Sequence, residues 1–194
     1  KEEFLPMLNL KTIAKIIGAL LGLEALLMSV CLCVSLLYQD KDIIAFIWSI
    51  LITIVAGGAF RLMGRHANNT ISRRDAYFVV AVTWIIFSLF GTLPFLISGH
   101  ITSFTNAFFE TMSGFTTTGA TIVDFPEHFP KGLLFWRSLT QWIGGLGIVF
   151  FTIAILPSLV GGSLKVFAAE ATGPIKSKLH PRLSMGAKWI WMVY

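Results

Sequence analysis

Charged residues are scarce in this chain. Asp, Glu, Lys and Arg make up 13% of its 194 residues, against about 25% in an average soluble domain. Hydrophobic residues make up 55%, and the mean hydropathy is +0.77. This composition excludes a soluble globular protein and indicates an integral membrane protein, with room for one membrane domain and no separate soluble one.

Cysteine and histidine are also too few, and too poorly spaced, for a disulfide framework or a metal site. Cys31 and Cys33 are two residues apart in an apolar run, so they point to different helix faces and are expected to pack as small hydrophobic side chains. The four histidines have no ligand spacing, and there is no nucleophile–base pair and no phosphate-binding glycine loop. We therefore expect neither an enzyme nor a cofactor.

Four apolar runs are long enough to cross a bilayer, which takes about 20 helical residues. They are Ile16–Leu37, Ile43–Phe60, Ala76–Ser98 and Ser138–Leu159. Another apolar segment begins at Leu183 and reaches only Tyr194, and the chain does not begin with Met. We therefore expect a truncated chain whose N-terminus is also incomplete.

Prolines, glycines and polar residues mark the ends and contacts of these spans. Pro94 predicts a kink or an end in the third span. The polar stretch Asp124–Arg137 predicts an aqueous loop. In the fourth span Gly144, Gly145 and Gly147 form a small-residue patch, which predicts a tight helix contact or, as a second possibility, a hinge.

The distribution of positive charge predicts the orientation in the membrane. The N-terminus, the loop between the second and third spans, and everything after Leu159 together carry 12 of the 15 Lys and Arg residues. By the positive-inside rule this side is cytoplasmic. The net charge of +5 is therefore explained by orientation and does not indicate a nucleic-acid partner.

Glu24 lies near the middle of the first span, where an ionisable side chain is costly and suggests a function. The alternative is a structural one, in which Glu24 faces another helix or a polar pocket, in its charged or its protonated form. The sequence names no partner for it, and the structural alternative is favoured. Both remain open.

A short apolar helix is predicted at about residues 105–115, between the third and fourth spans. Its centre, Asn106–Gly114, is 9 residues, or about 14 Å of helix at ~1.5 Å per residue, roughly half of the bilayer core. A segment of this length is a re-entrant helix or a piece of soluble core. By orientation it enters from outside, and its C-terminal end, which carries roughly half a negative charge, would favour a cation below it.

The stretch Thr116–Thr121 is β-branched and hydroxylic, which opposes helix continuation. Extended backbone at membrane depth is tolerated where its carbonyls line a water-filled or ion-filled cavity. Carbonyls that replace a hydration shell form the selectivity filter of potassium channels, and Gly119 has the freedom to point one at an axis. We therefore predict a filter at residues 116–121. An ordinary Thr/Gly loop is the alternative.

Two charged residues flank this stretch. Glu110, on the short helix, is expected to pair with a neighbour or to anchor the filter, and less readily to bind a proton or ion itself. Arg137 is expected by default to snorkel at the membrane interface. Repulsion of cations, or balance of Glu110 or Asp124, are the alternatives.

Several motifs resemble the TrkH family of the Trk/Ktr/HKT potassium transporter superfamily. Phe109-Glu110 and the run from Ser113 to Thr121 are similar to its first filter loop, and Phe135–Ile148, with the pattern WRxxxQWxGGxG, to the helix that follows. Ala154–Pro157 and Ala169–Pro174 match the stretch beyond it. The spans Ile16–Leu37 and Ile43–Phe60 resemble the additional N-terminal helix pair of the family.

The resemblance implies the N-terminal portion of a longer, all-α integral membrane protein. Its parts would be an extra N-terminal helix pair, one M1–P–M2 potassium-channel-like repeat with a re-entrant pore helix and an extended filter, and the start of a second repeat. The corresponding divisions are 1–74 for the helix pair and cytoplasmic loop, 75–160 for the first repeat, and 161–194 for a cytoplasmic connector and the second repeat.

The resemblance also implies potassium uptake across the bacterial inner membrane, with the N-terminus cytoplasmic. K⁺ would be held by the backbone around Thr117, Thr118 and Gly119, with Thr116 and Ala120 flanking, and Glu110, Gly114 and Thr121 as possible filter support. A glycine at position 119 is associated with potassium preference. The family's partners are a TrkA-like cytosolic nucleotide-binding ring and a second copy in a homodimer. A non-conducting membrane subunit and a homotetramer of single repeats are the alternatives.

Overall fold

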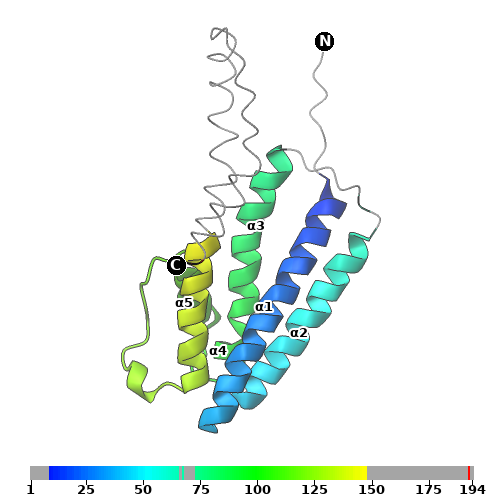
Figure 1. Cartoon of the computed structure of the whole chain (residues 1–194). Helices are drawn as coiled ribbons and strands as arrows, with labels where there is room; N and C mark the ends of the chain where they lie inside the picture. Colours follow the sequence, from blue (N-terminus) through cyan, green and yellow to red (C-terminus); the bar gives the residue numbers. More distant parts are fainter. Residues whose placement is uncertain (1–8, 66, 68–72, 148–191, 193–194) are drawn as a thin grey trace, which may run out of the picture. The chain divides into compact units, whose positions relative to one another are not determined.

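The computed structural model describes residues 9–65, 67, 73–147 and 192. The described residues form helices, turns and irregular loops and contain no strand. The chain divides into two compact units between Gln141 and Trp142. The described part of the first unit, residues 1–141, includes the helices α1 to α5, which Figure 1 labels, the short 3₁₀-helix η1, and the helical residues 131–141.

Two long helices form an N-terminal hairpin. α1 spans Leu10–Tyr38 and α2 spans Ile43–Met63, and each is apolar enough to cross a membrane. α1 begins six residues earlier than predicted, because Asn9 caps it by accepting a hydrogen bond from the Thr12 N–H at 3.3 Å. It ends at Gln39, whose φ of 54° is the left-handed conformation common at helix ends.

The hairpin packs closely because glycines face each other. A Cβ on Gly18 would lie 2.6 Å from the Gly57 carbonyl oxygen, and one on Gly57 would lie 3.1 Å from the Gly18 carbonyl oxygen. Neither position leaves room for a side chain without a shift of backbone. α1 and α2 therefore approach to backbone contact, as small residues allow in membrane helices, and they run side by side in Figure 1.

The third predicted span consists of two helices. α3 spans Arg73–Gly91 and the short α4 spans Leu93–Ile97. The interruption falls at Thr92, and Pro94 lies in the first turn of α4. The N–H groups of a first turn have no partner within the helix, so a proline there costs no hydrogen bond. Phe78–Ile97 remains long and apolar enough to cross a membrane. The helix is therefore interrupted near Pro94, as predicted, but Pro94 itself lies at the start of the next helix, α4.

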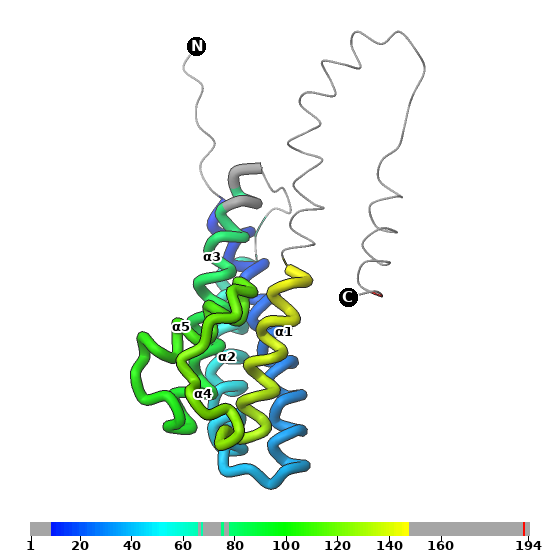
Figure 2. The backbone as a smooth tube through the Cα atoms, turned by 90° about the vertical axis from the view of Figure 1, so that its left-hand side faces the viewer, coloured from blue at the N-terminus to red at the C-terminus, as the bar shows by residue number. Residues whose placement is uncertain are grey.

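α5, Phe104–Phe115, is the short helix predicted at about 105–115. Its 12 residues span about 18 Å, which is too short to cross a bilayer of ~30 Å. It packs on α3. In Figures 1 and 2 the chain leaves α5 without regular structure and turns back toward the end where α5 begins.

The predicted loop Asp124–Arg137 is wrong in its second half. A 3₁₀-helix, η1, covers Pro126–His128, but residues 131–147 are helical. This 131–147 helix is yellow in Figure 1. The Lys131 N–H donates to the Asp40 carboxylate at 2.7 Å, so a residue 91 positions away caps the new helix. The predicted span to Leu159 continues outside the described residues.

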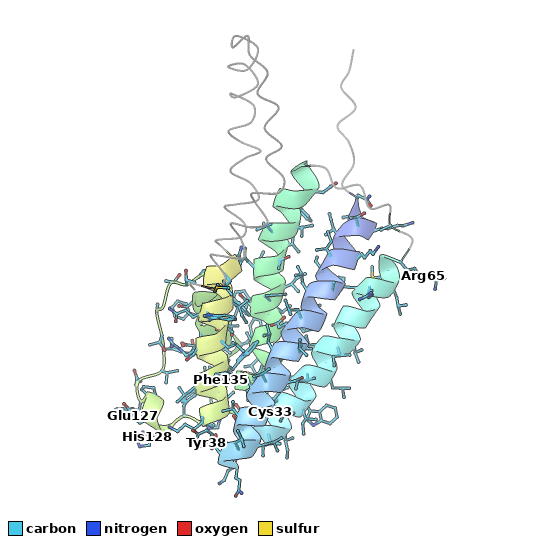
Figure 3. The ribbon with its side chains drawn as sticks, in the orientation of Figure 1. Cys33, Tyr38, Arg65, Glu127, His128 and Phe135 are labelled. Carbon is cyan, nitrogen blue, oxygen red and sulfur yellow. The ribbon has the colours of Figure 1, made fainter. Side chains whose placement is uncertain are left out.

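Figure 3 places labelled residues at opposite ends of the hairpin. Arg65 lies at one end, beyond α2, and Tyr38 at the other, where α1 ends. Glu127 and His128 lie near the same end as Tyr38. Within the first unit, Arg65 and η1 therefore lie toward opposite ends of the hairpin. The predicted division at 161–194 falls outside the described residues except for Met192.

Candidate functional site

The segment after α5 is neither helix nor strand. Residues 116–117 form a turn, and residues 118–123 have no regular secondary structure. Thr116, Thr118, Gly119, Ala120 and Thr121 are exposed and Thr117 is half-buried. We call residues 116–121 the threonine segment. It is therefore open on one side, and its conformation is set by contacts made by its ends and by α5.

Two residues of the threonine segment have left-handed backbone. Thr117 has φ of 57° and Gly119 has φ of 75°. For a β-branched residue such as threonine this conformation is a genuine outlier, and it persists only where the surroundings hold it in place. Positive φ at alternate residues also turns peptide planes away from the arrangement of a regular strand.

Three consecutive carbonyls of the threonine segment accept no hydrogen bond from any residue that the structure describes. They belong to Thr117, Thr118 and Gly119, and we call them the open carbonyls. The flanking carbonyls are engaged: that of Thr116 accepts from the Thr117 hydroxyl at 2.7 Å, and that of Ala120 from the Ser113 hydroxyl at 2.6 Å. An unpaired backbone carbonyl oxygen is a strong acceptor that can bind a hydrogen-bond donor or a cation.

Ser113, near the end of α5, holds the middle of the threonine segment, from Thr118 to Ala120. Its carbonyl accepts the N–H groups of Thr118 at 3.0 Å and Gly119 at 3.4 Å, while its hydroxyl donates to the Ala120 carbonyl. In the sequence, Ser113 is distinguished only as the first residue of the run from Ser113 to Thr121, and its spacing of seven residues from Ala120 matches no regular period.

Glu110, on α5, binds the chain just after the open carbonyls. It is 1% exposed, and its two carboxylate oxygens accept from the Thr121 hydroxyl and from the Ile122 N–H, each at 2.9 Å. The Thr121 hydroxyl also accepts the Val123 N–H at 3.0 Å. One buried carboxylate therefore fixes the exit of the threonine segment to the helix that precedes it.

Arg137, on the 131–147 helix, donates from Nε to the same Glu110 carboxylate. This contact agrees with the alternative in which Arg137 balances Glu110. The default expectation, an arginine that snorkels at the membrane interface, stays a prediction. The 131–147 helix begins six residues before Arg137 and holds this side chain against α5. α5, the threonine segment and the following helix share one charged anchor.

Gly114 allows the same helix to approach α5. It is buried, and a Cβ at this position would collide with the Thr140 hydroxyl and would lie 3.2 Å from the Thr140 Cβ. Gln141, one residue on, has its amide nitrogen 3.6 Å from where a Cβ on Gly119 would lie. Thr140 and Gln141 were not predicted as neighbours of the segment.

A cleft of about 450 Å³ adjoins the exit of the threonine segment. Its lining includes residues from before α5, from α5 itself and from the loop after the segment, namely His100, Ser103, Asn106, Ile122, Asp124 and His128. Residues that precede α5 in the sequence and residues that follow the threonine segment therefore line the same cleft, near the start of α5.

The remaining candidate residues lie outside α5 and the threonine segment. Glu24 is on α1 and is 1% exposed. Gly144, Gly145 and Gly147 fall within the 131–147 helix, with Gly144 buried, and the tight contact predicted for them stays a prediction. No group of three or more His, Cys, Asp or Glu residues suited to a metal ion occurs within the described part of the chain.

Comparison with known proteins gives one consistent result. The family model named TrkH, described as "Cation transport protein", matches residues 42–194. Among curated proteins, the chain is 39% identical over 189 residues to "Trk system potassium uptake protein TrkH" of Halomonas elongata, and 33% identical over 189 residues to the protein of the same name from Escherichia coli K12.

A solved structure agrees with these sequence matches. The "Crystal Structure of the Potassium Transporter TrkH from Vibrio parahaemolyticus" is similar with a TM-score of 0.76 and 32% identity, over 95% of this chain and 36% of that one. Each of the two curated matches covers 96% of this chain and 39% of the relative. The chain thus spans about two fifths of the length of the curated relatives that it matches.

Proposed function

Because the chain belongs to the TrkH family of cation transport proteins, we propose that it forms part of the wall of a potassium-conducting pore. The backbone carbonyls of Thr117, Thr118 and Gly119 are the ion ligands in this proposal. The relatives are named potassium uptake proteins, and potassium uptake across the bacterial inner membrane is the activity we propose for the complete protein.

The observation that carries the proposal is the set of three open carbonyls. Thr117, Thr118 and Gly119 present acceptors that no described residue satisfies, on an exposed segment whose two ends are held. A dehydrated potassium ion needs oxygen ligands in place of its water. Oxygen atoms on a backbone held by hydrogen bonds to α5 supply such ligands without reorganisation when the ion arrives.

Flanking groups support the open carbonyls. The Ser113 hydroxyl holds the Ala120 carbonyl, and Glu110 holds Thr121 and Ile122. Both act from α5, so the helix and the ligands move as one body. Gly114 lets the 131–147 helix press against α5, and Arg137 locks the contact through Glu110. In the proposal these residues position the filter and do not touch the ion.

The helix dipole of α5 adds to the attraction for a cation. α5 ends at Phe115, immediately before the threonine segment, and the C-terminal end of a helix carries roughly half a negative charge. With the N-terminus in the cytoplasm, this end points toward the middle of the membrane from outside. The cleft at the opposite end of α5 would then face the outer solution.

The chain supplies one such segment, and in the proposal the remaining walls come from equivalent units outside it. A homodimer of the complete protein and a TrkA-like cytosolic ring on the basic cytoplasmic side complete the proposed assembly. Gly144, Gly145 and Gly147 would then form the contact between the fourth span and a neighbouring helix.

The experiment is potassium uptake by the complete product of the gene that encodes this chain. Expression in a bacterium that lacks its own potassium uptake systems is expected to restore growth at low external potassium, and the purified protein in liposomes is expected to pass K⁺ in preference to Na⁺. Failure of both assays contradicts the proposal and favours the non-conducting subunit. A native mass corresponding to four copies would favour the homotetramer of single repeats.

A further inference from the structure

Glu24 is a buried acid that the proposed pore does not use. It lies near the middle of α1, a helix of 29 residues that is apolar enough to cross a membrane. It is 1% exposed, and both carboxyl oxygens are buried without a hydrogen-bond partner among the residues that the structure describes. Acids in this position are rare and usually serve a function.

Glu24 reaches from the N-terminal hairpin to the back of α5. A Cβ on Gly91 of α3 would lie 3.4 Å from Glu24 Oε1, 3.1 Å from Phe115 Cε2 and 2.5 Å from Thr111 Cγ2. Three helices thus meet around one point. The Phe115 ring is also in contact with Phe87 and Trp136, so the surroundings of the carboxyl are apolar.

Hydroxyl and N–H groups on the elements around this point are already engaged. The Thr111 hydroxyl donates to the Ala107 carbonyl at 2.7 Å, and the Trp136 indole N–H donates to the Gly91 carbonyl at 3.0 Å. One turn earlier on α3, the Ser88 hydroxyl donates to the Met112 sulfur at 3.1 Å. A carboxylate at this position would therefore find no donor from these groups.

No described cation compensates Glu24 either. Glu110 and Arg137, the charged pair on the far side of α5, satisfy each other. The other described charged side chains on the helices around Glu24 do not hydrogen-bond to its carboxyl. They are Lys11 and Lys15 on α1, Arg61 on α2, Asp42 at its start, Asp75 on α3, and Lys131 on the 131–147 helix.

We infer that Glu24 is a proton-binding residue, neutral while the N-terminal hairpin packs against α5. An anion in an apolar site without donors is far less favourable than the neutral acid. Loss of the proton breaks one O–H bond, passes H⁺ to water, and leaves a charge against the back of α5, the helix that precedes the open carbonyls. The hairpin is then a proton-sensitive support of the proposed filter.

The first test measures the proton directly and does not depend on ion transport. Infrared absorption separates a carboxylic acid from a carboxylate, so the complete protein in liposomes is compared with Glu24→Gln. The expected result is a protonated-carboxyl band at neutral pH that is absent in Glu24→Gln. If Glu24→Gln does not fold, Glu24→Asp keeps the acid and is expected to shift the band. No Glu24-dependent acid band at neutral pH overturns the inference.

The second test rests on the proposed function and measures K⁺ flux against pH. Flux through the parent is expected to fall as pH rises through the ionisation of Glu24, by about ten-fold per pH unit beyond the midpoint, since one proton is released. Glu24→Gln cannot ionise and is expected to keep its flux. Glu127→Gln, which removes an exposed acid in η1, is the matched control and should follow the parent.

The outcomes separate the two proposals. Superimposable pH profiles of the parent and Glu24→Gln overturn the role of Glu24 in supporting the filter. Absence of K⁺ flux in the parent at every pH contradicts the proposed function, while the infrared band still decides whether Glu24 holds a proton.

Discussion

Glu110 and Arg137 form an ion pair between α5 and the 131–147 helix, and the same carboxylate accepts the Ile122 N–H at 2.9 Å. The side chain of Glu110 is fully buried and that of Arg137 is 26% exposed. One side chain therefore connects the helix before the threonine segment, the backbone after it, and the next helix. Few single contacts in the described part of the chain join three elements.

Replacement of Glu110 by Gln is expected to destabilise the protein and to loosen ion selection. Removal of one partner of a buried pair costs roughly 3 kcal/mol, because the other charge loses its counterion. The amide of Gln also has only one acceptor oxygen in place of two. It therefore cannot accept from the Thr121 hydroxyl, the Ile122 N–H and Arg137 together. Thermal unfolding in detergent and the ratio of K⁺ to Na⁺ flux measure the two effects.

Glu127→Gln is the control for this change, because Glu127 is an exposed acid in η1. It is expected to leave both the melting temperature and the flux ratio close to those of the parent. Equal behaviour of Glu110→Gln and Glu127→Gln would contradict the anchoring role.

Replacement of Gly119 by Ala is expected to weaken preference for K⁺ over Na⁺. Gly119 has φ of 75°, where a Cβ costs about 1 kcal/mol, and its nearest neighbour in that direction, Gln141 Nε2, is 3.6 Å away. The change thus strains the backbone at an open carbonyl without a severe collision. Flux ratios in liposomes measure the result, and Gly119→Ser is expected to act in the same direction.

Gly99→Ala is a matched control for the backbone strain. Gly99 has φ of 74° and open space around it, so the substitution imposes a similar conformational cost far from the threonine segment in sequence. It is expected to lower stability by a similar amount and to leave ion preference unchanged. If the two variants alter selectivity equally, Gly119 is not a filter residue.

The sequence predicted the helices of this unit well where they are long and apolar, and it predicted α5 because apolar residues followed by β-branched residues define a short helix with an abrupt end. Boundaries set by distant residues could not be predicted. The 131–147 helix begins after Pro130 because Asp40, from the hairpin loop, accepts the Lys131 N–H. Local composition there is that of a loop.

The threonine segment was located from its residue types, but the contacts that hold it were not. Ser113 and Gln141 belong to motifs of the sequence, but nothing in those motifs indicates their contacts with the segment. These contacts, and the place of Thr140 beside Gly114, depend on how α5 and the 131–147 helix pack. For Arg137 the sequence left alternatives open, because 27 residues separate it from Glu110 and no periodicity relates them. Such pairings follow from tertiary packing.

Replacement of Gly114 by Ala is expected to destabilise the contact between α5 and the 131–147 helix. The added Cβ collides with the Thr140 hydroxyl, and overpacking of this kind costs about 1–3 kcal/mol. Thr140→Ala, introduced together with it, removes that hydroxyl and is expected to restore part of the loss, because the Thr140 Cβ remains 3.2 Å from the added atom. Thermal unfolding of the four proteins gives the coupling.

Gly22→Ala serves as the control, since a Cβ at Gly22 of α1 has nothing within 4 Å. Alanine favours helix over glycine by roughly 1 kcal/mol, so this variant is expected to be as stable as the parent or more so. Additive effects of Gly114→Ala and Thr140→Ala would show that the two residues do not meet.

Asp42, at the start of α2, is expected to make stability depend on pH. The side chain is fully buried beside Gly132, where a Cβ would lie 2.7 Å from Asp42 Oδ2. Burial raises the pKa of Asp42 above its ordinary value of 3.8, the adjacent charge of Asp40 adds to this effect, and the Ser35 hydroxyl offsets part of it. The folded state therefore holds this proton more tightly than the unfolded state.

The sign of the effect follows from linkage. Between pH 3.8 and the raised native pKa the folded state binds more protons, so the contribution of Asp42 to stability falls as pH rises and is constant above that interval. The side chain of Asp42→Asn does not titrate, so this variant does not lose stability as pH rises through that interval. The melting temperature of Asp42→Asn minus that of the parent is therefore expected to increase from acid to neutral pH and then level off. Glu127→Gln should give a difference that stays flat across this range, and a difference for Asp42→Asn that decreases toward neutral pH would show that Asp42 is stabilised as the anion.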